Sequence, residues 1–168
     1  DVDHLDRFGS IDRIEDEFAD MARRATGTLV VCGDDPRALS VAGRRGATGT
    51  LTYGFAAEND VTLSEPVTEG GGTVFTVASR GGSAVVRLPL LGRHNALNCA
   101  GAMAMASVLG VPFGESAAAV ASFAGVDRRF AARGTVRGAL LIDDYAHLPA
   151  EIDATLAAAR THPGLTGR

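Results

Sequence analysis

Apolar residues recur along the chain with two different spacings, which predict helices and strands. Over 10–24 they return every three or four residues, the period of an amphipathic helix, on a face formed by Ile11, Ile14, Phe18, Met21 and Ala22. Ser10 is placed to cap this helix. The continuous apolar run at 28–32 predicts a strand in a sheet covered on both faces, and Pro36 is expected in the first turn of the next helix. A second short strand is predicted over 48–54.

The spacing changes from helical to alternating between 58 and 90. Three β-prone runs, separated by glycine clusters, predict an antiparallel meander of three strands. A long helix is expected over 94–109, ended by Gly110, with its apolar face formed by Leu97, Ala100, Ala104 and Val108. A second helix is expected over 115–124, ended by Gly125.

The last part of the chain predicts one strand and one helix. The strand lies within 136–145 and emerges from a glycine turn, and the helix over 149–160 has Pro149 in its first turn. The whole order predicts an α/β fold with an antiparallel insert. A composition shift around 130–138, where arginine and glycine gather, indicates a domain link, so we expect one domain over 1–132 and the start of a second α/β domain over 133–168.

Composition narrows the class of protein. The chain has 168 residues, is 46% hydrophobic and carries a net charge of −4, and all 16 basic residues are arginine. Without a basic patch, neither a nucleic-acid surface nor a membrane surface is expected. Cys32 and Cys99 lie in apolar runs and are interpreted as buried thiols. The sequence shows no signal peptide and no apolar stretch near about 20 residues, so we expect a cytosolic protein. Because it opens on Asp1, we interpret the chain as a piece of a longer one.

Two polar clusters lie before or at the start of predicted helices. In the first, His4 stands among Asp1, Asp3 and Asp6. An imidazole oriented by carboxylates can hold a cation near phosphates, and a polar loop before a helix is the alternative. The second cluster is GRHNALN at 92–98, where free helix N–H groups and asparagine amides offer the donor and acceptor that an adenine edge requires. A plain helix cap is the alternative there.

Two further clusters follow later in the chain. Arg128 and Arg129 can clamp a phosphate, or they form a solvated surface pair. The segment IDDYAH at 142–147 stands at the carboxyl end of a strand, where ligands bind in open α/β sheets. A carboxylate there can take both hydroxyls of a ribose, while the tyrosine and histidine can touch a second substrate. An acidic turn that caps the next helix is the alternative.

The order of these segments resembles the Mur ligase family. The resemblance rests on DHLD at 3–6, GRHNALN at 92–98, GVDRRF at 125–130 and DDYAHLPAEIDATLAAAR at 143–160, and it covers essentially the whole chain. It implies part of a three-layer central ATPase domain with an antiparallel subsheet, followed by the first strand–helix unit of a Rossmann-like C-terminal domain.

The resemblance also implies an activity. The forms DDYAH and AEIDATL favour the family member that adds L-alanine to UDP-N-acetylmuramate, in peptidoglycan precursor synthesis, over those that add meso-diaminopimelate or D-glutamate. The implied reaction uses ATP and Mg²⁺ to convert the carboxylate to an acyl phosphate, which the amino group of alanine then attacks. Another Mur-type ligase, such as the recycling tripeptide ligase, and a non-catalytic nucleotide-binding module remain alternatives.

Roles carried over from the family place the nucleotide among the first three motifs. His4 would coordinate magnesium near the γ-phosphate and the acyl phosphate, as a catalytic and metal-binding residue. Arg129, with Arg128 as the second choice, would reach the nucleotide from the domain junction. The adenine would lie beside three residues of the second motif, His94, Asn95 and Asn98.

The fourth motif would hold the ribose and border the amino-acid site. Either Asp143 or Asp144 would bind the ribose, and Tyr145 and His147 would be catalytic residues beside the amino acid. Leu148 departs from the family, which commonly has a second histidine there.

Other departures concern whole segments. The family's glycine-rich phosphate loop is absent from the sequence, as is any lysine, and so are the UDP-binding domain and most of the C-terminal domain. We therefore expect the parent protein to be an enzyme and this chain alone to be inactive, because nothing in it cradles the β- and γ-phosphates.

Overall fold

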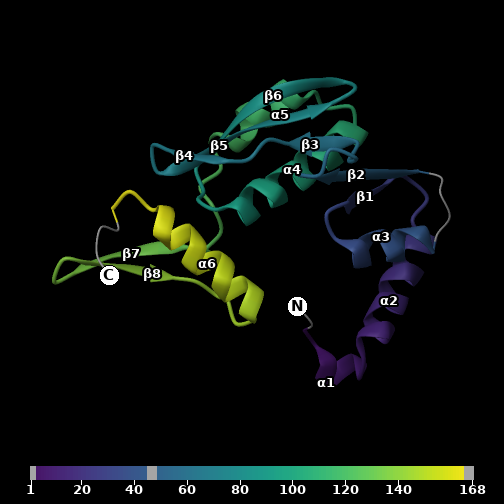
Figure 1. The fold of residues 1–168 in the computed structure, drawn as a ribbon, viewed down its shortest axis with the longest axis horizontal. Helices are drawn as coiled ribbons and strands as arrows, with labels where there is room; N and C mark the ends of the chain where they lie inside the picture. The colour runs from purple at the N-terminus through teal and green to yellow at the C-terminus, as the bar shows by residue number, and fades with distance from the viewer. Residues whose placement is uncertain (1–2, 45–48, 165–168) are drawn as a thin grey trace.

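The computed structural model describes residues 3–44 and 49–164 and shows a mixed α/β fold (Figure 1). Within these residues the main sheet has six strands, and β1, β2 and β3 pair in parallel. The long strand β5 then carries β3 and β4 along one edge and β6 along the other, all antiparallel. The strands are β1 (Leu29–Cys32), β2 (Thr50–Gly54), β3 (Val61–Leu63), β4 (Val67–Glu69), β5 (Gly72–Ser79) and β6 (Gly82–Leu88).

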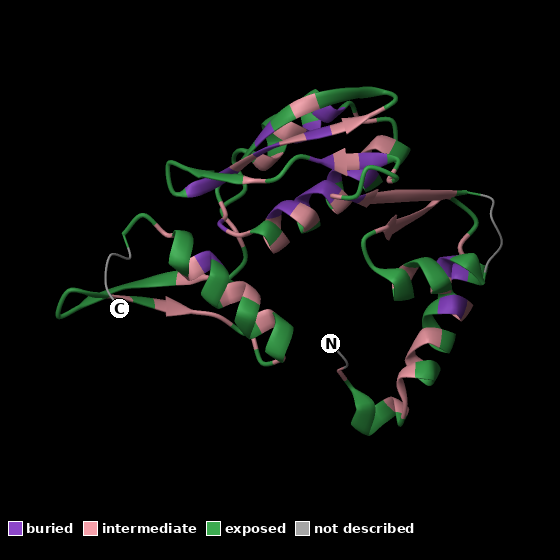
Figure 2. Cartoon of the chain, in the orientation of Figure 1, coloured by how far each residue is buried: buried purple, intermediate pink, exposed green. Residues whose placement is uncertain are grey.

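The core lies between one face of this sheet and two helices, α4 (Arg93–Val108) and α5 (Phe113–Val120). Alternate residues of β3, β5 and β6 point into it, as the period of two in a strand requires. Helix α4 contributes Met103 and smaller side chains, and α5 contributes Phe113; the buried residues of α4 are purple in Figure 2. The buried core residues are Val61, Leu63, Phe75, Val77, Val86, Leu88, Ala96, Cys99, Ala100, Met103, Ala104 and Phe113.

Two helices precede β1 and one follows it. They are α1 (Leu5–Phe8), α2 (Ile11–Arg24) and α3 (Pro36–Gly43). The Ser10 hydroxyl accepts the Arg13 N–H, which confirms the predicted cap of α2. Asp35 caps α3 by accepting the N–H of Arg37, and Pro36 occupies the first turn as predicted.

A second, two-stranded sheet and a helix complete the described chain. Strands β7 (Ala131–Val136) and β8 (Ala139–Asp143) form an antiparallel hairpin, and α6 (Pro149–Thr161) follows. Helix α6 packs on the start of α4 through small residues: Ala158 is buried, and a Cβ on Gly92 would lie 3.1 Å from its side chain. Because Gly92 has φ of 101°, the chain turns into α4 at a position that favours glycine.

Several sequence predictions are corrected by the structure. The expected meander is part of one continuous sheet and contains a fourth strand, β4, whose three residues are all exposed. Phe18 and Met21 are 53% and 54% exposed, because α2 packs on α3 through Ala19 and Ala22 instead. Val108 lies in the last turn of α4 and is exposed. The buried residues of this helix, which include Cys99 and Met103, all lie in earlier turns.

Two further corrections concern helix and strand ends. Helix α5 ends at Val120, and Gly125 lies beyond it in a loop with φ of 86°. A strand that the sequence did not predict, β7, lies within the segment expected to be a domain link, and the link itself stays a prediction. Thr48, the first residue of the predicted second strand, lies outside the described residues, as does Asp1 of the first polar cluster. None of the described helices is long and apolar enough to cross a membrane.

Candidate functional site: a cavity between α4 and α6

A cavity of about 740 Å³ lies where the first half of α4 faces α6 and the loop that follows α5. Its wall is largely apolar and includes Leu88, Leu90, Phe123 and Phe130. The polar side chains that reach it come from separate parts of the sequence: His94, Asn95, Asn98, Arg129, Asp144, Glu151 and Thr155. An apolar cavity with a few convergent polar groups is the usual form of a small-molecule site.

The two asparagines of α4 differ in what their amides already bind. Asn95 donates from Nδ2 to the carbonyl oxygen of Leu91 at 2.7 Å, which ties it to the turn before the helix. Asn98 is exposed in the cavity, and its amide forms no hydrogen bond with any other residue that the structure describes. Its donor and acceptor are therefore available to a ligand.

His94 is the third cavity residue of α4, and it favours the neutral form. Burial lowers the pKa of its imidazole, nearby Arg129 lowers it further, and Asp144 acts in the opposite direction. A neutral imidazole offers one donor and one acceptor nitrogen to the cavity.

Asp144 joins the loop at 128–130 to the end of β8. Its Oδ2 accepts the N–H of Phe130 at 2.8 Å, and its Oδ1 accepts the N–H of Ala146 at 2.7 Å. Tyr145 also donates its N–H to the carbonyl oxygen of Arg128 at 2.8 Å. The carboxylate thus ties the loop at 128–130 to the segment that follows β8, and it also lines the cavity. Each of its oxygens retains a lone pair for a further donor.

Asp143 has a different set of contacts, outside the cavity lining. Its Oδ2 accepts from Nη2 of Arg133 at 2.9 Å, and the same guanidinium binds Asp127 at 2.6 Å. Neighbouring residues on a strand point to opposite faces, which explains why the two acids have different partners. Asp143 braces the hairpin, and only Asp144 lines the cavity.

Tyr145 lies between two arginines and a histidine. The guanidinium carbons of Arg128 and Arg129 are 4.9 Å and 5.8 Å from the centre of its ring, within cation–π range. The His147 ring meets it edge-on at 5.3 Å. Arg128 is in the left-handed region with φ of 59°, so the loop turns at the first residue of the arginine pair.

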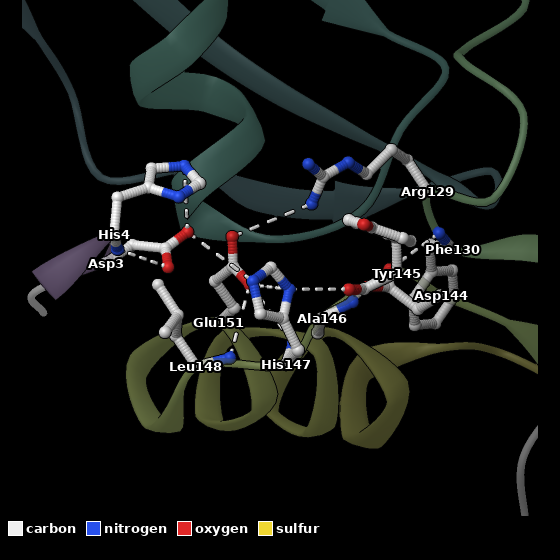
Figure 3. Close-up of polar contacts among 10 residues, drawn as sticks. All are labelled: Asp3, His4, Arg129, Phe130, Asp144, Tyr145, Ala146, His147, Leu148 and Glu151. Carbon is white, nitrogen blue, oxygen red and sulfur yellow. Dashed lines mark hydrogen bonds and ion pairs between the residues drawn. The ribbon is translucent and has the colours of Figure 1, made fainter. Parts of the chain in front are cut away.

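His147 connects this loop to the start of the chain, as Figure 3 shows. Its Nε2 is 3.5 Å from Oδ2 of Asp3, and the same oxygen is 3.4 Å from Nε2 of His4. One carboxylate therefore stands between two histidines that are 143 positions apart in the sequence. On its other side, His147 faces Glu151, which also lies 3.9 Å from Nη1 of Arg129.

The magnesium ion implied at His4 does not fit a site made by these residues alone. Magnesium prefers oxygen ligands in octahedral geometry. Over 3–44 and 49–164, no group of three or more histidine, cysteine, aspartate or glutamate side chains is arranged to hold a metal. The His4 side chain is 70% exposed, and its ion-pair partner among the described residues is Asp3.

The structure thus divides the expected site residues into two groups. His94, Asn95, Asn98, Arg129 and Asp144 meet in the cavity lining. Outside the lining lie the five others: His4, Arg128, Asp143, Tyr145 and His147. Sequence reasoning placed Asp3 beside His4 but missed its contact with His147, and it missed Glu151 altogether. Glutamate in the first turn of a helix is a capping signal that could have indicated the second of these.

Comparisons with known proteins show that the chain is similar to one protein family. A family model described as the Mur ligase middle domain matches residues 1–106. The chain is 42% identical over 169 residues to a UDP-N-acetylmuramate–L-alanine ligase of Paenarthrobacter aurescens (strain TC1), covering 98% of this chain and 36% of that protein. The chain therefore spans about a third of the length of the curated relatives it matches.

Solved structures show the same fold. A UDP-N-acetylmuramate–alanine ligase MurC from Thermotoga maritima superimposes with a TM-score of 0.77 at 27% identity, covering 95% of this chain and 36% of that one. A MurF ligase from the same organism, in complex with ADP, superimposes with a TM-score of 0.79 at 24% identity, covering 96% and 37%.

Proposed function

Since the chain belongs to the Mur ligase family, we propose that it carries the nucleotide-binding cavity of an ATP-dependent ligase that joins L-alanine to UDP-N-acetylmuramate. One observation carries the proposal: three motifs from separate parts of the sequence supply polar side chains to one largely apolar cavity. The alanine ligases among the relatives favour this substrate pair, and the ADP complex of a structural neighbour favours an adenine nucleotide.

The cavity offers a distinct group for each part of the nucleotide. The free amide of Asn98 would bind the adenine edge beside neutral His94, and Phe130 and the leucines would cover the base faces. Asp144, which keeps lone pairs beyond its two backbone contacts, would accept the ribose hydroxyls. Arg129 at the cavity edge would attract the phosphates.

The reacting end would lie beyond Arg129, toward the second group of residues. In the proposed reaction ATP activates the carboxylate of the sugar substrate as an acyl phosphate, and the amino group of alanine displaces phosphate. Arg128 would then stand with Arg129 near the phosphates, Tyr145 and His147 would border the amino acid, and Asp3 would join His147 to His4 on the phosphate side. Charge neutralisation and positioning are the main demands of such a step. Magnesium at His4 stays a prediction from the resemblance.

We also retain the domain division at 132/133 as a proposal. The main sheet with its helices lies before it, and β8 and α6 lie after it. Strand β7 (Ala131–Val136) crosses the division, so the hairpin is the connection between the two proposed domains.

The nucleotide site is tested by titrating ADP and CDP into the chain and following binding by calorimetry and NMR. We expect ADP to bind more tightly than CDP. Asn98→Ala should weaken ADP binding by about 5- to 30-fold, because one or two ligand hydrogen bonds are lost without a change in folding. The matched control is Met105→Ala, an exposed residue of the same helix outside the cavity, which should bind as the wild type does. Equal binding of ADP by the wild type and Asn98→Ala would remove the adenine assignment.

The ligase activity is tested in the full-length protein that contains this sequence. ADP release should require both UDP-N-acetylmuramate and L-alanine. Release supported equally by another amino acid, or by no amino acid, would refute the proposed substrate pair.

A further inference from the structure

Glu151, in the first turn of α6, contacts two of the expected site residues through its two carboxylate oxygens. Oε2 accepts the N–H of His147 at 3.1 Å and that of Leu148 at 3.4 Å, and it lies 3.4 Å from Nδ1 of the His147 ring. Oε1 lies 3.9 Å from Nη1 of Arg129. The side chain is one-third exposed and lines the cavity. Figure 3 shows its contacts with His147 and Arg129.

The orientation of the His147 ring follows from its acceptors. Nδ1 lies 3.1 Å from the carbonyl oxygen of Tyr145, which can only accept, so Nδ1 carries a proton. Nε2 faces the carboxylate of Asp3 at 3.5 Å, a contact that is favourable when Nε2 is protonated too. The Tyr145 carbonyl, Glu151 and Asp3 together raise the pKa of His147. Glu151 therefore binds the backbone N–H of His147, and it is one of the groups that raise the pKa of the His147 ring.

The same carboxylate lies near the Arg129 guanidinium at the cavity edge. The Arg129 side chain is 54% exposed, and it also lies near the Tyr145 ring, at 5.8 Å. A long, exposed arginine has many rotamers, so a nearby fixed charge restricts where its guanidinium stands.

We propose that Glu151 is a positioning residue, which holds the His147 ring and the Arg129 guanidinium at the cavity so that an incoming nucleotide meets them already in place. The inference rests on the proposed function for its consequence in nucleotide binding. The proposal predicts that the negative charge of Glu151 contributes to ADP affinity, in addition to the contribution of its side chain to capping α6.

Glu151→Gln separates charge from capping. Glutamine retains an acceptor oxygen for the N–H groups at the start of α6, as in a capping box, but it carries no charge. We expect its melting temperature to equal that of the wild type, the pKa of His147 to fall in NMR titrations, and ADP affinity to drop by about 3- to 10-fold through lost preorganisation. The matched control is Asp153→Asn, an exposed acid of the same helix outside the cavity, which should change none of these.

A double-mutant comparison tests whether Glu151 affects ADP affinity through Arg129. If Glu151 acts through Arg129, the variant Glu151→Gln/Arg129→Gln should bind ADP as weakly as Arg129→Gln alone and no weaker. Additive losses would overturn this coupling. Tighter ADP binding by Glu151→Gln would also overturn the proposal, since Glu151 would then compete with the nucleotide for the arginine.

The two proposals fail in different ways. A wild-type chain that does not bind ADP contradicts the proposed function, and the His147 titration still decides whether Glu151 positions the ring. A wild-type chain that binds ADP, with a Glu151→Gln variant unchanged in both affinity and His147 pKa, overturns the positioning role and leaves the proposed function standing.

Discussion

Replacing each acid of the pair at 143 and 144 by alanine should have unequal effects on stability. Asp144 accepts two backbone N–H groups at 2.7 and 2.8 Å from a partly buried position. Hydrogen bonds to a charged group contribute about 1.5–3 kcal/mol each, so with partial exposure Asp144→Ala should cost about 2–4 kcal/mol. Asp143 makes an exposed ion pair with Arg133, which keeps Asp127 as a partner, so Asp143→Ala should cost roughly 0–1 kcal/mol.

The assay combines thermal melting with hydrogen exchange. For a chain of this size each kcal/mol shifts the melting temperature by about 2–4 °C, so Asp144→Ala should melt roughly 5–15 °C lower and Asp143→Ala within a few degrees of the wild type. Exchange should accelerate at the amides of Phe130 and Ala146, which Asp144 binds. ADP affinity should fall only for Asp144→Ala. Equal stabilities for the two variants, or a larger loss for Asp143→Ala, would refute the assignment of the two carboxylates.

Three further predictions concern α4 and the helix beside it. Gly101→Ala should destabilise the fold by about 0.5–2 kcal/mol in chemical denaturation, because its Cβ would stand 2.7 Å from the Tyr53 ring, whereas Gly114→Ala, with open space around it, should be neutral or stabilising. Because burial lowers the pKa of His94 from 6.5, the stability it contributes is full above that pH and is lost as the pH falls through the folded-state pKa. His94→Gln should therefore flatten the acid side of a plot of melting temperature against pH, and an unchanged slope would contradict this. Burial raises the pKa of the Cys99 thiol to about 11, so iodoacetamide at pH 8 should label it, as judged by peptide mass spectrometry, only after denaturation.

Much of the fold could be predicted because local signals and tertiary packing agree. Ser10 and Pro36 mark helix starts through their own backbone chemistry, and the structure confirms both. Strand β7 was missed because five of its six residues are exposed, so no alternation of apolar residues marks it. Its strand conformation comes from antiparallel pairing with β8. The exposure of Phe18 was missed because periodicity identifies an apolar face but not whether another element covers it.

The candidate site was predictable in parts but not as an arrangement. Asn95 and Asn98 share a helix start, so their proximity follows from the sequence. The sequence offered no means to decide between Asp143 and Asp144, because only the partners across the hairpin distinguish them. The contact of Asp3 with His147 joins the start of the described chain to the segment before α6, and no local pattern encodes such a distant pair.

The position of β1 in the sheet has a consequence for handling the protein. Parallel strands are normally enclosed by neighbours, yet β1 pairs only with β2 among the described strands and stands at the end of the sheet. Its other edge, four apolar residues from Leu29 to Cys32, presents backbone N–H and C=O groups that can template a strand from another molecule. We therefore expect the isolated chain to self-associate through this edge as its concentration rises, and a charged residue at the outer edge of β1 to suppress that aggregation.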